Sequence, residues 1–440
     1  MKNLFTYNNN KFFFSKVENI INNILICLIV LFPIVLLSGP FLPDLIIVLT
    51  SIYFIYLTIK KNNFVKLFNT LLIKFLGIFW IYLIISSFFS DHIIFSLRSS
   101  LFYLRFIIFS CFICFVLDSY PNFKKYFLIS IIFAFVFVQI DSIYQFYNNK
   151  DIFGFSKPNL RLTGPFKDRQ IVGSYLSRLL PLLIFIYLVL KKNINYKLNL
   201  FIFSTALVVL LSGERTSFFM ITFFIFSYVF IYYNLKNLIL FFLLYFVVFF
   251  GLILSTNDVN ERFYKQTLEG FAIKKYTKTD GIDNYFDLKP KKGFYLYSRA
   301  HEVHYATSTK MFLDNKIFGV GPNMFRKKCR ENKFFIEESS CTTHPHNTAL
   351  QILAETGLLG FSFYALILFY LIFKIVCVCK NKIKFYKITE KEKNEFILHI
   401  SFIINTFLIV LPSGNFFNNY LNAIIFLPLG FYMNYINNHE

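Results

Sequence analysis

The segment His344-Pro345-His346-Asn347 holds the residues of this chain best suited to proton transfer. It joins a polar stretch to an apolar run that starts at Thr348, so both imidazoles should lie where water meets membrane. An imidazole titrates near neutral pH and can therefore take a proton from a hydroxyl group and return it. Asn347 is suited to cap the following helix, whose N-terminal dipole favours a neutral ring. The competing interpretation is a pair of solvated loop histidines.

Four of the arginines in or beside apolar runs are singled out here, because a charged side chain at such a place usually faces a cavity or an anion. Arg98 and Arg105 are seven residues apart and would share one face of a helix. Arg215 lies in a hinge between two apolar runs, and Arg299 begins an amphipathic stretch. A guanidinium group binds phosphate oxygens in pairs and stays charged at any working pH, which predicts a phosphate-bearing ligand. Alternatively, Arg98 reaches the membrane surface and Arg215 pairs with Glu214.

A metal site is the other chemistry that these residue types allow. His301, Glu302 and His304 lie in the same polar stretch as His344 and His346, and all are zinc-ligand types. Their spacing differs from the His-Glu-x-x-His pattern, and this polar stretch contains no Cys-x-x-Cys pair. The sequence therefore favours a site without a metal ion.

Composition predicts that membrane helices position these residues. The 440 residues are 56% hydrophobic and 21% aromatic, with a mean hydropathy of +0.56. Many apolar runs approach or exceed the roughly 18 residues that can cross about 30 Å of hydrocarbon. The first run lacks a small-residue cleavage site and is expected to be retained. We expect an all-α polytopic membrane protein with about 12 transmembrane helices. The predicted spans are residues 20–37, 42–59, 71–89, 96–117, 126–147, 171–190, 198–211, 217–233, 238–255, 348–376, 396–411 and 420–435.

Lysines orient the predicted bundle, because loops on the cytoplasmic side carry an excess of basic residues. With the N-terminus inside, the short outer turns near Ser90 and Pro412 carry no lysine or arginine. The formal net charge of +21 then reflects an anionic inner leaflet and needs no nucleic-acid partner. The lysines expected inside are Lys2, Lys11, Lys16, Lys60, Lys61, Lys124, Lys125, Lys191, Lys192, Lys197, Lys236, Lys380, Lys382, Lys384, Lys387, Lys391 and Lys393.

Three regions follow from this pattern. Residues 1–255 hold nine predicted helices, residues 256–346 form one long outer loop with short helices, and residues 347–440 hold three more helices. The loop is too short for an independent domain with a large core, so we expect it to lie over the bundle as a lid.

Two of the seven cysteines, Cys329 and Cys341, fall in this outer loop just ahead of the histidines. An oxidising compartment permits a disulfide between them, which would contribute about 3 kcal/mol to the free energy of unfolding. The alternative is two free thiols, since the sequence does not give their separation in space.

Several segments resemble motifs of the O-antigen ligase and polymerase superfamily. The histidine segment, followed by Leu350, Glu355-x-Gly357 and Gly360, resembles its signature segment. Arg299-Ala300 with Phe318-Gly319-Val320-Gly321, Ser212-Gly213-Glu214-Arg215-Thr216, and Arg161-Leu162-Thr163-Gly164-Pro165-Phe166 followed by Gly173 and Tyr175 are similar to its further motifs. Asp168-Arg169-Gln170 replaces the asparagine-rich stretch of the family, and no role is transferred there.

The resemblance implies a glycosyltransferase of the bacterial inner membrane that acts at its periplasmic face. Family members transfer a glycan from an undecaprenyl-diphosphate carrier to an acceptor hydroxyl, and the acceptor expected here is a lipid A-core sugar. The resemblance implies no cofactor, because the donor is already activated. His346 would be the base, with His344 orienting it or substituting for it. Arg215 and Arg299 would hold the diphosphate and stabilise its developing charge. The remaining candidates for substrate binding are Arg105, Arg98 and Asn347.

Other functions remain open at this stage. A polysaccharide polymerase and a protein O-glycosyltransferase of the same superfamily would use the same residues. A transporter of lipid-linked sugars would also place arginines in a cavity, but it predicts repeats that this sequence lacks. A non-catalytic envelope scaffold would need no histidine.

Overall fold

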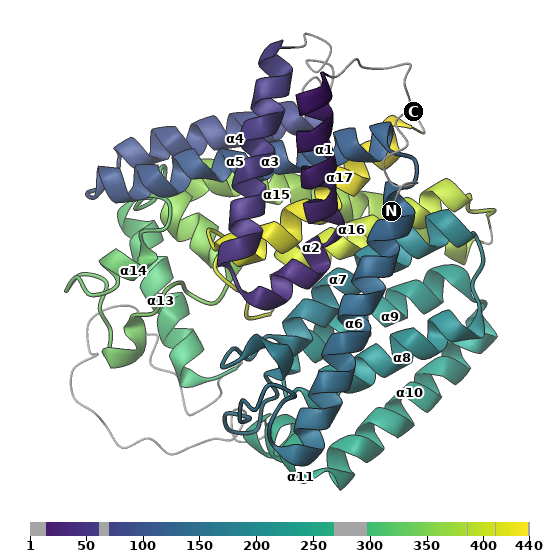
Figure 1. Ribbon diagram of the computed structural model, residues 1–440. Helices are drawn as coiled ribbons and strands as arrows, with labels where there is room; N and C mark the ends of the chain where they lie inside the picture. The colour runs from purple at the N-terminus through teal and green to yellow at the C-terminus, as the bar shows by residue number, and fades with distance from the viewer. Residues whose placement is uncertain (1–14, 61–69, 268–296, 385, 410, 439–440) are drawn as a thin grey trace.

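The computed structural model describes residues 15–60, 70–267, 297–384, 386–409 and 411–438 (Figure 1). Within these ranges the chain is helical and forms no sheet, apart from an isolated bridge between Lys150 and Ser156. The predicted all-α fold is confirmed.

The first six α-helices and one 3-10 turn precede an irregular loop that begins at Asn149. Helix α1 starts with a capping box, in which Ser15 accepts from the Glu18 amide and Glu18 accepts from the Ser15 amide. The first predicted span is bent by 58° where α1 meets α2, whose first turn contains Pro33. The elements are α1 (Lys16–Val30), α2 (Phe32–Val35), η2 (Leu36–Ser38), α3 (Phe41–Lys60), α4 (Leu71–Phe88), α5 (Ile93–Ser119) and α6 (Phe123–Asn148).

The middle of the chain forms a second group of helices, of which α6, α8, α9 and α10 run alongside one another (Figure 1). Asparagine side chains cap two of them, Asn195 on α8 and Asn234 on α10. The elements are η4 (Gly164–Phe166), α7 (Val172–Lys191), α8 (Tyr196–Leu211), α9 (Arg215–Tyr232), α10 (Leu235–Ser255), α11 (Asn257–Asn260) and the π-helical turn η5 (Glu261–Lys265).

The last part of the chain carries two helices, α13 and α14, that lie beside α15 at one side of the bundle (Figure 1). The elements are α13 (Arg299–Asp314), α14 (Phe325–Lys328), η6 (Glu338–Ser340), α15 (Thr348–Ile383), α16 (Glu390–Phe402), the π-helical turn η7 (Ile403–Phe407) and α17 (Asn419–Asn437). A small apolar core that includes Met311, Met324 and Phe334 packs α13 and α14 against Ala354 of α15. The polar stretch is therefore folded onto the membrane helices.

Eight helices of the described residues are long and apolar enough to cross a membrane, and the bent α1–α2 pair would make nine. The protein is thus a multi-pass membrane protein. All twelve predicted runs fall on helices, but the count of about 12 spans is not confirmed. Helix α8 has 16 residues, α16 begins with charged residues, and asparagines lower the hydropathy of α17.

The centre of the bundle is formed by α5 and α7, whereas α10 lies at its edge. In the most apolar window of each helix, 83% of the α7 residues are buried but only 11% of the α10 residues. Helix α5 packs against α3, α4 and α17, where Tyr103 and Phe106 contact Phe426 through their rings. Helix α10 therefore presents most of its apolar surface outward, as expected for a helix in contact with lipid.

Helix α15 is interrupted at Gly357, where the backbone has a φ of +64°. The interruption leaves carbonyl groups of the preceding turn free to accept new hydrogen bonds. The Val320 amide donates to the Ala354 carbonyl at 3.0 Å, and the Gly321 amide donates to the Glu355 carbonyl at 2.9 Å. The Glu355 side chain accepts from the Phe325 amide at 2.8 Å. Two motifs far apart in sequence are thus paired through their backbones, which fixes the segment between α13 and α14 against the first half of α15.

Candidate active site

Four histidines form one cluster at the start of α15. The ring centroids of His344 and His346 are 4.2 Å apart, and His346 lies 5.3 Å from His304 and 5.5 Å from His301. His301 and His304 come from the first two turns of α13, so the cluster joins two elements. The sequence predicted two of these rings as catalytic, and the packing of α13 against α15 adds the other two.

His344 is held through both ring nitrogens. Its Nε2 lies 3.0 Å from the Ser413 carbonyl oxygen, and its Nδ1 lies 2.9 Å from Thr343 Oγ1. A carbonyl oxygen can only accept, so Nε2 carries the proton and Nδ1 accepts from the threonine hydroxyl. Burial lowers the pKa of His344 to about 4, so the ring is neutral at pH 7. These contacts suit a positioning role better than that of a base.

His346 differs in having open ring nitrogens. The backbone of His346 has a φ of +56°, and the His346 carbonyl oxygen accepts a hydrogen bond from the Ser413 amide at 2.8 Å. Its ring nitrogens make no hydrogen bond within the described parts of the chain, and its side chain is half-buried. Burial, followed by the neighbouring His344, His304 and His301 rings, lowers its pKa to about 3. The result is a neutral imidazole with a free lone pair.

The two histidines of α13 line the same cluster. His301 Nδ1 lies 2.7 Å from the hydroxyl oxygen of Ser298, the residue that caps α13. His304 is buried without a well-formed hydrogen bond to either ring nitrogen, although the backbone of Ser339 opposes the lowering of its pKa. Burial is the main reason that both pKa values are lowered. Among the described residues, no group of three or more His, Cys, Asp or Glu side chains is arranged to hold a metal ion.

Arg215 lies close to this cluster. Its positive charge is one cause of the lowered pKa of His301, after burial and His304. Arg215 Nη1 donates to Thr267 Oγ1 at 3.1 Å, and its side chain is half-buried at the first residue of α9. The geometry thus brings a base-competent histidine cluster and a guanidinium group from a distant part of the sequence into one region.

Two further arginines, Arg161 and Arg262, surround the hinge that carries Arg215. Arg161 Nη1 donates to Gln170 Oε1 at 3.1 Å, and Arg262 Nε donates to the Gly213 carbonyl at 3.4 Å. Burial, then the charges of Arg161 and Arg215, lower the pKa of Arg262 to about 10. No carboxylate among the described residues forms a salt bridge with any of the three. We call Arg161, Arg215 and Arg262 the arginine cluster.

Glu214 does not pair with Arg215 but caps another helix. Its carboxylate accepts from the Gly173 amide at 2.7 Å and the Ser174 amide at 3.0 Å, in the first turn of α7. Ser217 donates a third hydrogen bond at 2.9 Å. Burial raises the pKa of Glu214 to about 7. A Cβ at Gly173 would lie only 2.9 Å from Ser217 Cβ, so this contact requires glycine.

Arg299 and Asn347 contact neighbouring protein groups. Arg299 forms a salt bridge with Glu337 at 2.5 Å and has further contacts. Asn347 caps α15 by accepting from the Leu350 amide at 3.0 Å, as the sequence predicted, and it also donates to the Ile409 carbonyl.

The α5 arginines are not part of the described cluster. Arg105 pairs with Asp44 at 2.9 Å and stacks on Phe106, while Arg98 is exposed. No contact in the described structure joins either of them to the histidines or to Arg215. The sequence showed that Arg98 and Arg105 share a helix face, but not that Arg105 has an acidic partner, because Asp44 lies in another helix, α3.

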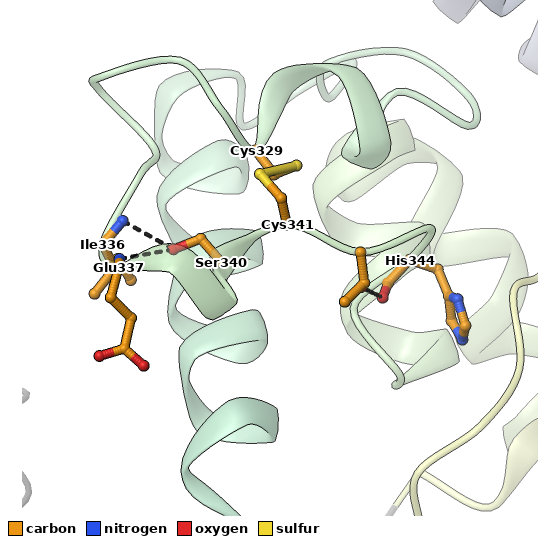
Figure 2. Close-up of a disulfide and its surroundings, with 7 residues drawn as sticks. Cys329, Ile336, Glu337, Ser340, Cys341 and His344 are labelled. Atoms are coloured by element: carbon orange, nitrogen blue, oxygen red, sulfur yellow. Dashed lines mark hydrogen bonds between the residues drawn. A yellow bond between two sulfur atoms is a disulfide. The ribbon is translucent and has the colours of Figure 1, made fainter.

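A disulfide joins Cys329 and Cys341, whose Cα atoms are 5.2 Å apart (Figure 2). Within the closed loop, Ser340 Oγ accepts from the Ile336 and Glu337 amides at 2.9 and 3.0 Å. Glu337 in turn binds Arg299, and the chain after Cys341 leads directly to His344 (Figure 2). The closed loop therefore connects the start of α13 to the histidine segment.

Sequence reasoning missed Arg262 and gave Arg161 no separate role. Arg161 begins one of the motifs quoted above, and the Leu162 amide donates to the Ser212 carbonyl at 3.2 Å, which places the motif at the hinge. Arg262 follows α11 in a stretch without a recognisable motif, so only the tertiary fold reveals it.

The chain is thus a multi-pass helical membrane protein with histidines and arginines gathered at helix ends. Residues 200–365 match the family model described as O-Antigen ligase, which supports placing this protein in the O-antigen ligase superfamily. The match runs from α8 to the first half of α15 and includes Arg215, α13 and the histidine segment. It implies an enzyme of the glycosyltransferase or ligase type. No curated protein matches the chain.

Proposed function

We propose that this protein is an O-antigen ligase-like glycosyltransferase of the bacterial inner membrane. It moves a glycan from an undecaprenyl-diphosphate carrier to the hydroxyl group of a lipid A-core sugar at the periplasmic face. The observation that carries the proposal is a neutral histidine with free ring nitrogens in a cluster that also feels the charge of Arg215. A neutral histidine can deprotonate the acceptor hydroxyl, and an arginine can stabilise the diphosphate as it leaves.

His346 is the proposed base. The acceptor oxygen attacks the anomeric carbon of the donor, and the bond from that carbon to the diphosphate oxygen breaks. The hydroxyl proton passes to a free ring nitrogen of His346. His344, fixed by Thr343 and Ser413, keeps the segment in place. His301 and His304 keep His346 neutral through burial and repulsion of a further positive charge.

The arginine cluster is the proposed diphosphate site. Expulsion of the lipid diphosphate concentrates negative charge on its oxygens, which fixed guanidinium groups can stabilise without reorganisation. Arg215 and Arg262 both lie within reach of the positive charge of Arg161, and no described carboxylate forms a salt bridge with these side chains. Arg299 remains a second proposed contact, which would exchange Glu337 for a phosphate oxygen on donor binding.

The test is incubation of the purified protein with a lipid-linked glycan and two acceptors, lipid A-core and a second lipid-linked glycan. A product on lipid A-core identifies a ligase, whereas elongation of the lipid-linked glycan identifies a polymerase of the same superfamily. The matched control is His92→Ala, because His92 is an exposed histidine beside α5. Release of diphosphate without a new glycosidic bond, or no reaction with either acceptor, would contradict the proposal.

A further inference from the structure

A cavity of about 390 Å³ lies at the opposite end of the bundle from the histidines in the predicted topology. It is enclosed by the first turn of α6, the last turn of α7, the start of α16 and the end of α17, which pack against one another. These helix ends are the ones that the lysine distribution assigns to the cytoplasmic side. The cavity is therefore separate from the proposed active site and does not depend on glycan transfer.

Three lysines from three different elements line this cavity: Lys124, Lys192 and Lys391. Glu390 is the single carboxylate in the lining, and it is paired with Lys393 at 2.8 Å. Lys192 forms no salt bridge within the described residues, whereas Lys124 is attracted by the nearby Asp118, and Lys391 pairs with Glu395 at 3.8 Å and has a further contact. The lining itself holds three lysines and one carboxylate, with Asp118 and Glu395 next to it.

Asparagine side chains complete the lining and add hydrogen-bonding groups to it. Asn434 and Asn438 both donate to Asp118, at 2.9 and 3.2 Å, and the Asp118 carboxylate also attracts Lys124. Asn394 is 7% exposed, donates to Tyr435 and has a buried Oδ1 without a hydrogen-bond partner. A buried acceptor of this kind is costly unless a donor reaches it. A ligand that fits would place an anionic group on the lysines and a donor on Asn394.

We propose that this cavity, the inner lysine cavity, binds a phosphate group, supplied by an inner-leaflet phospholipid headgroup or by a free phosphate. Basic pockets between helices on the cytoplasmic side are suited to lipid headgroups, because the phosphate lies at the same depth as the lysines. A headgroup with glycerol hydroxyls or an ethanolamine ammonium also supplies the donor that Asn394 Oδ1 lacks. Free phosphate carries a P–OH donor at neutral pH and could also reach Asn394 Oδ1, so the two sources are separated by the experiment and not by this contact.

The experiment compares two triple variants of the full-length protein in detergent. Lys124→Gln, Lys192→Gln and Lys391→Gln together remove the cavity charges. The matched control is Lys125→Gln, Lys191→Gln and Lys387→Gln, which changes the net charge equally at exposed lysines outside the lining. Native mass spectrometry counts bound phosphatidylglycerol, phosphatidylethanolamine and phosphatidylcholine, and titration with inorganic phosphate follows the thermal unfolding midpoint.

We expect about tenfold weaker binding of phosphatidylglycerol by the cavity variant and a change within about twofold for the control. Inorganic phosphate that raises the unfolding midpoint of the unmodified protein, but not of the cavity variant, would instead identify free phosphate as the source. A third variant, with arginine at the three cavity positions, keeps the charge and should retain binding, which separates lost binding from misfolding. Equal losses in the cavity and control variants, or no bound phosphate in either arm, would overturn the proposal.

Discussion

His344 and His346 lie with their ring centroids 4.2 Å apart, yet only His344 is hydrogen-bonded through both ring nitrogens. The two residues are separated by a single proline in sequence and differ because His346 adopts a positive φ. That conformation turns its ring toward α13, while the ring of His344 faces the Ser413 carbonyl. The division of roles between base and positioning residue follows from this difference.

The first prediction is that His346→Ala lowers the rate of glycan transfer by a factor of about 100 to 10,000, the usual contribution of a general base. His344→Gln should cost less, because an amide can retain one of the two contacts made by the ring. Both rates come from the transfer assay, with His92→Ala as the control. A larger loss for His344→Gln than for His346→Ala would reverse the assignment.

The second prediction concerns the arginine cluster. Arg215→Lys and Arg262→Lys should each reduce kcat by at least about tenfold, because an ammonium group cannot bind two phosphate oxygens in the guanidinium geometry. Arg330→Lys is the matched control, since Arg330 is exposed in the outer segment. Near-normal rates in both cluster variants would indicate that these arginines only hold the hinge between α8 and α9.

The third prediction is a pH dependence of stability. The folded-state pKa of His344, about 4, lies below the ordinary value of 6.5, so the unfolded chain binds more protons between these values. His344 therefore contributes stability that is present above about pH 6.5 and is lost as the pH falls toward 4. Glu214, whose pKa is raised, contributes in the opposite sense between its ordinary value and about 7.

The comparison of the unmodified protein with His344→Gln isolates the histidine, because the Glu214 contribution is common to both. The difference in thermal unfolding midpoint should narrow as the pH is lowered from 7 to 4. A difference that is constant over this range would show that His344 keeps its ordinary pKa in the folded protein.

The fourth prediction concerns the contact between the outer segment and α15. A Cβ at Gly319 would lie 2.4 Å from the Glu355 carbonyl carbon, and the residue has a φ of +71°. Gly319→Ala should therefore destabilise the fold by about 1–3 kcal/mol or more and reduce activity. Gly154→Ala is the control, because Gly154 also has a positive φ but has nothing within 4 Å of the added methyl group. If both substitutions lower the unfolding midpoint equally, the loss of stability comes from the positive φ and not from the contact with Glu355.

The fifth prediction is that the Cys329–Cys341 disulfide supports activity more than membrane insertion. Replacing both cysteines by serine removes the covalent link that holds the chain before His344 close to the end of α14. We therefore expect a lower rate of glycan transfer with normal membrane insertion. Mass spectrometry of the non-reduced, proteolysed protein should yield a cross-linked peptide that contains both cysteines. Complete alkylation of both thiols without reductant would exclude the bridge.

The sequence determined the helical membrane class and the segments that carry chemistry. Apolar runs specify helices in lipid, because only helices satisfy their own backbone hydrogen bonds there. The polar residues at their ends therefore stood out, as with His344, His346 and Arg215. The sequence did not determine the number of spans. Helices α8, α16 and α17 form as predicted, but each is too short or too polar to be counted among the helices that can cross a membrane.

Only the tertiary structure decided which of these polar residues work together. Arg105 and Arg215 look alike in sequence, but the packing of α3 on α5 gives Arg105 the partner Asp44, whereas the hinge before α9 places Arg215 beside Arg161 and Arg262. The role of Gly357 also depended on the fold, because the break in α15 is stabilised by amides from residues 320 and 321. Contacts between residues far apart in the chain carry no periodic signal, so local pattern identifies the residues but not their partners.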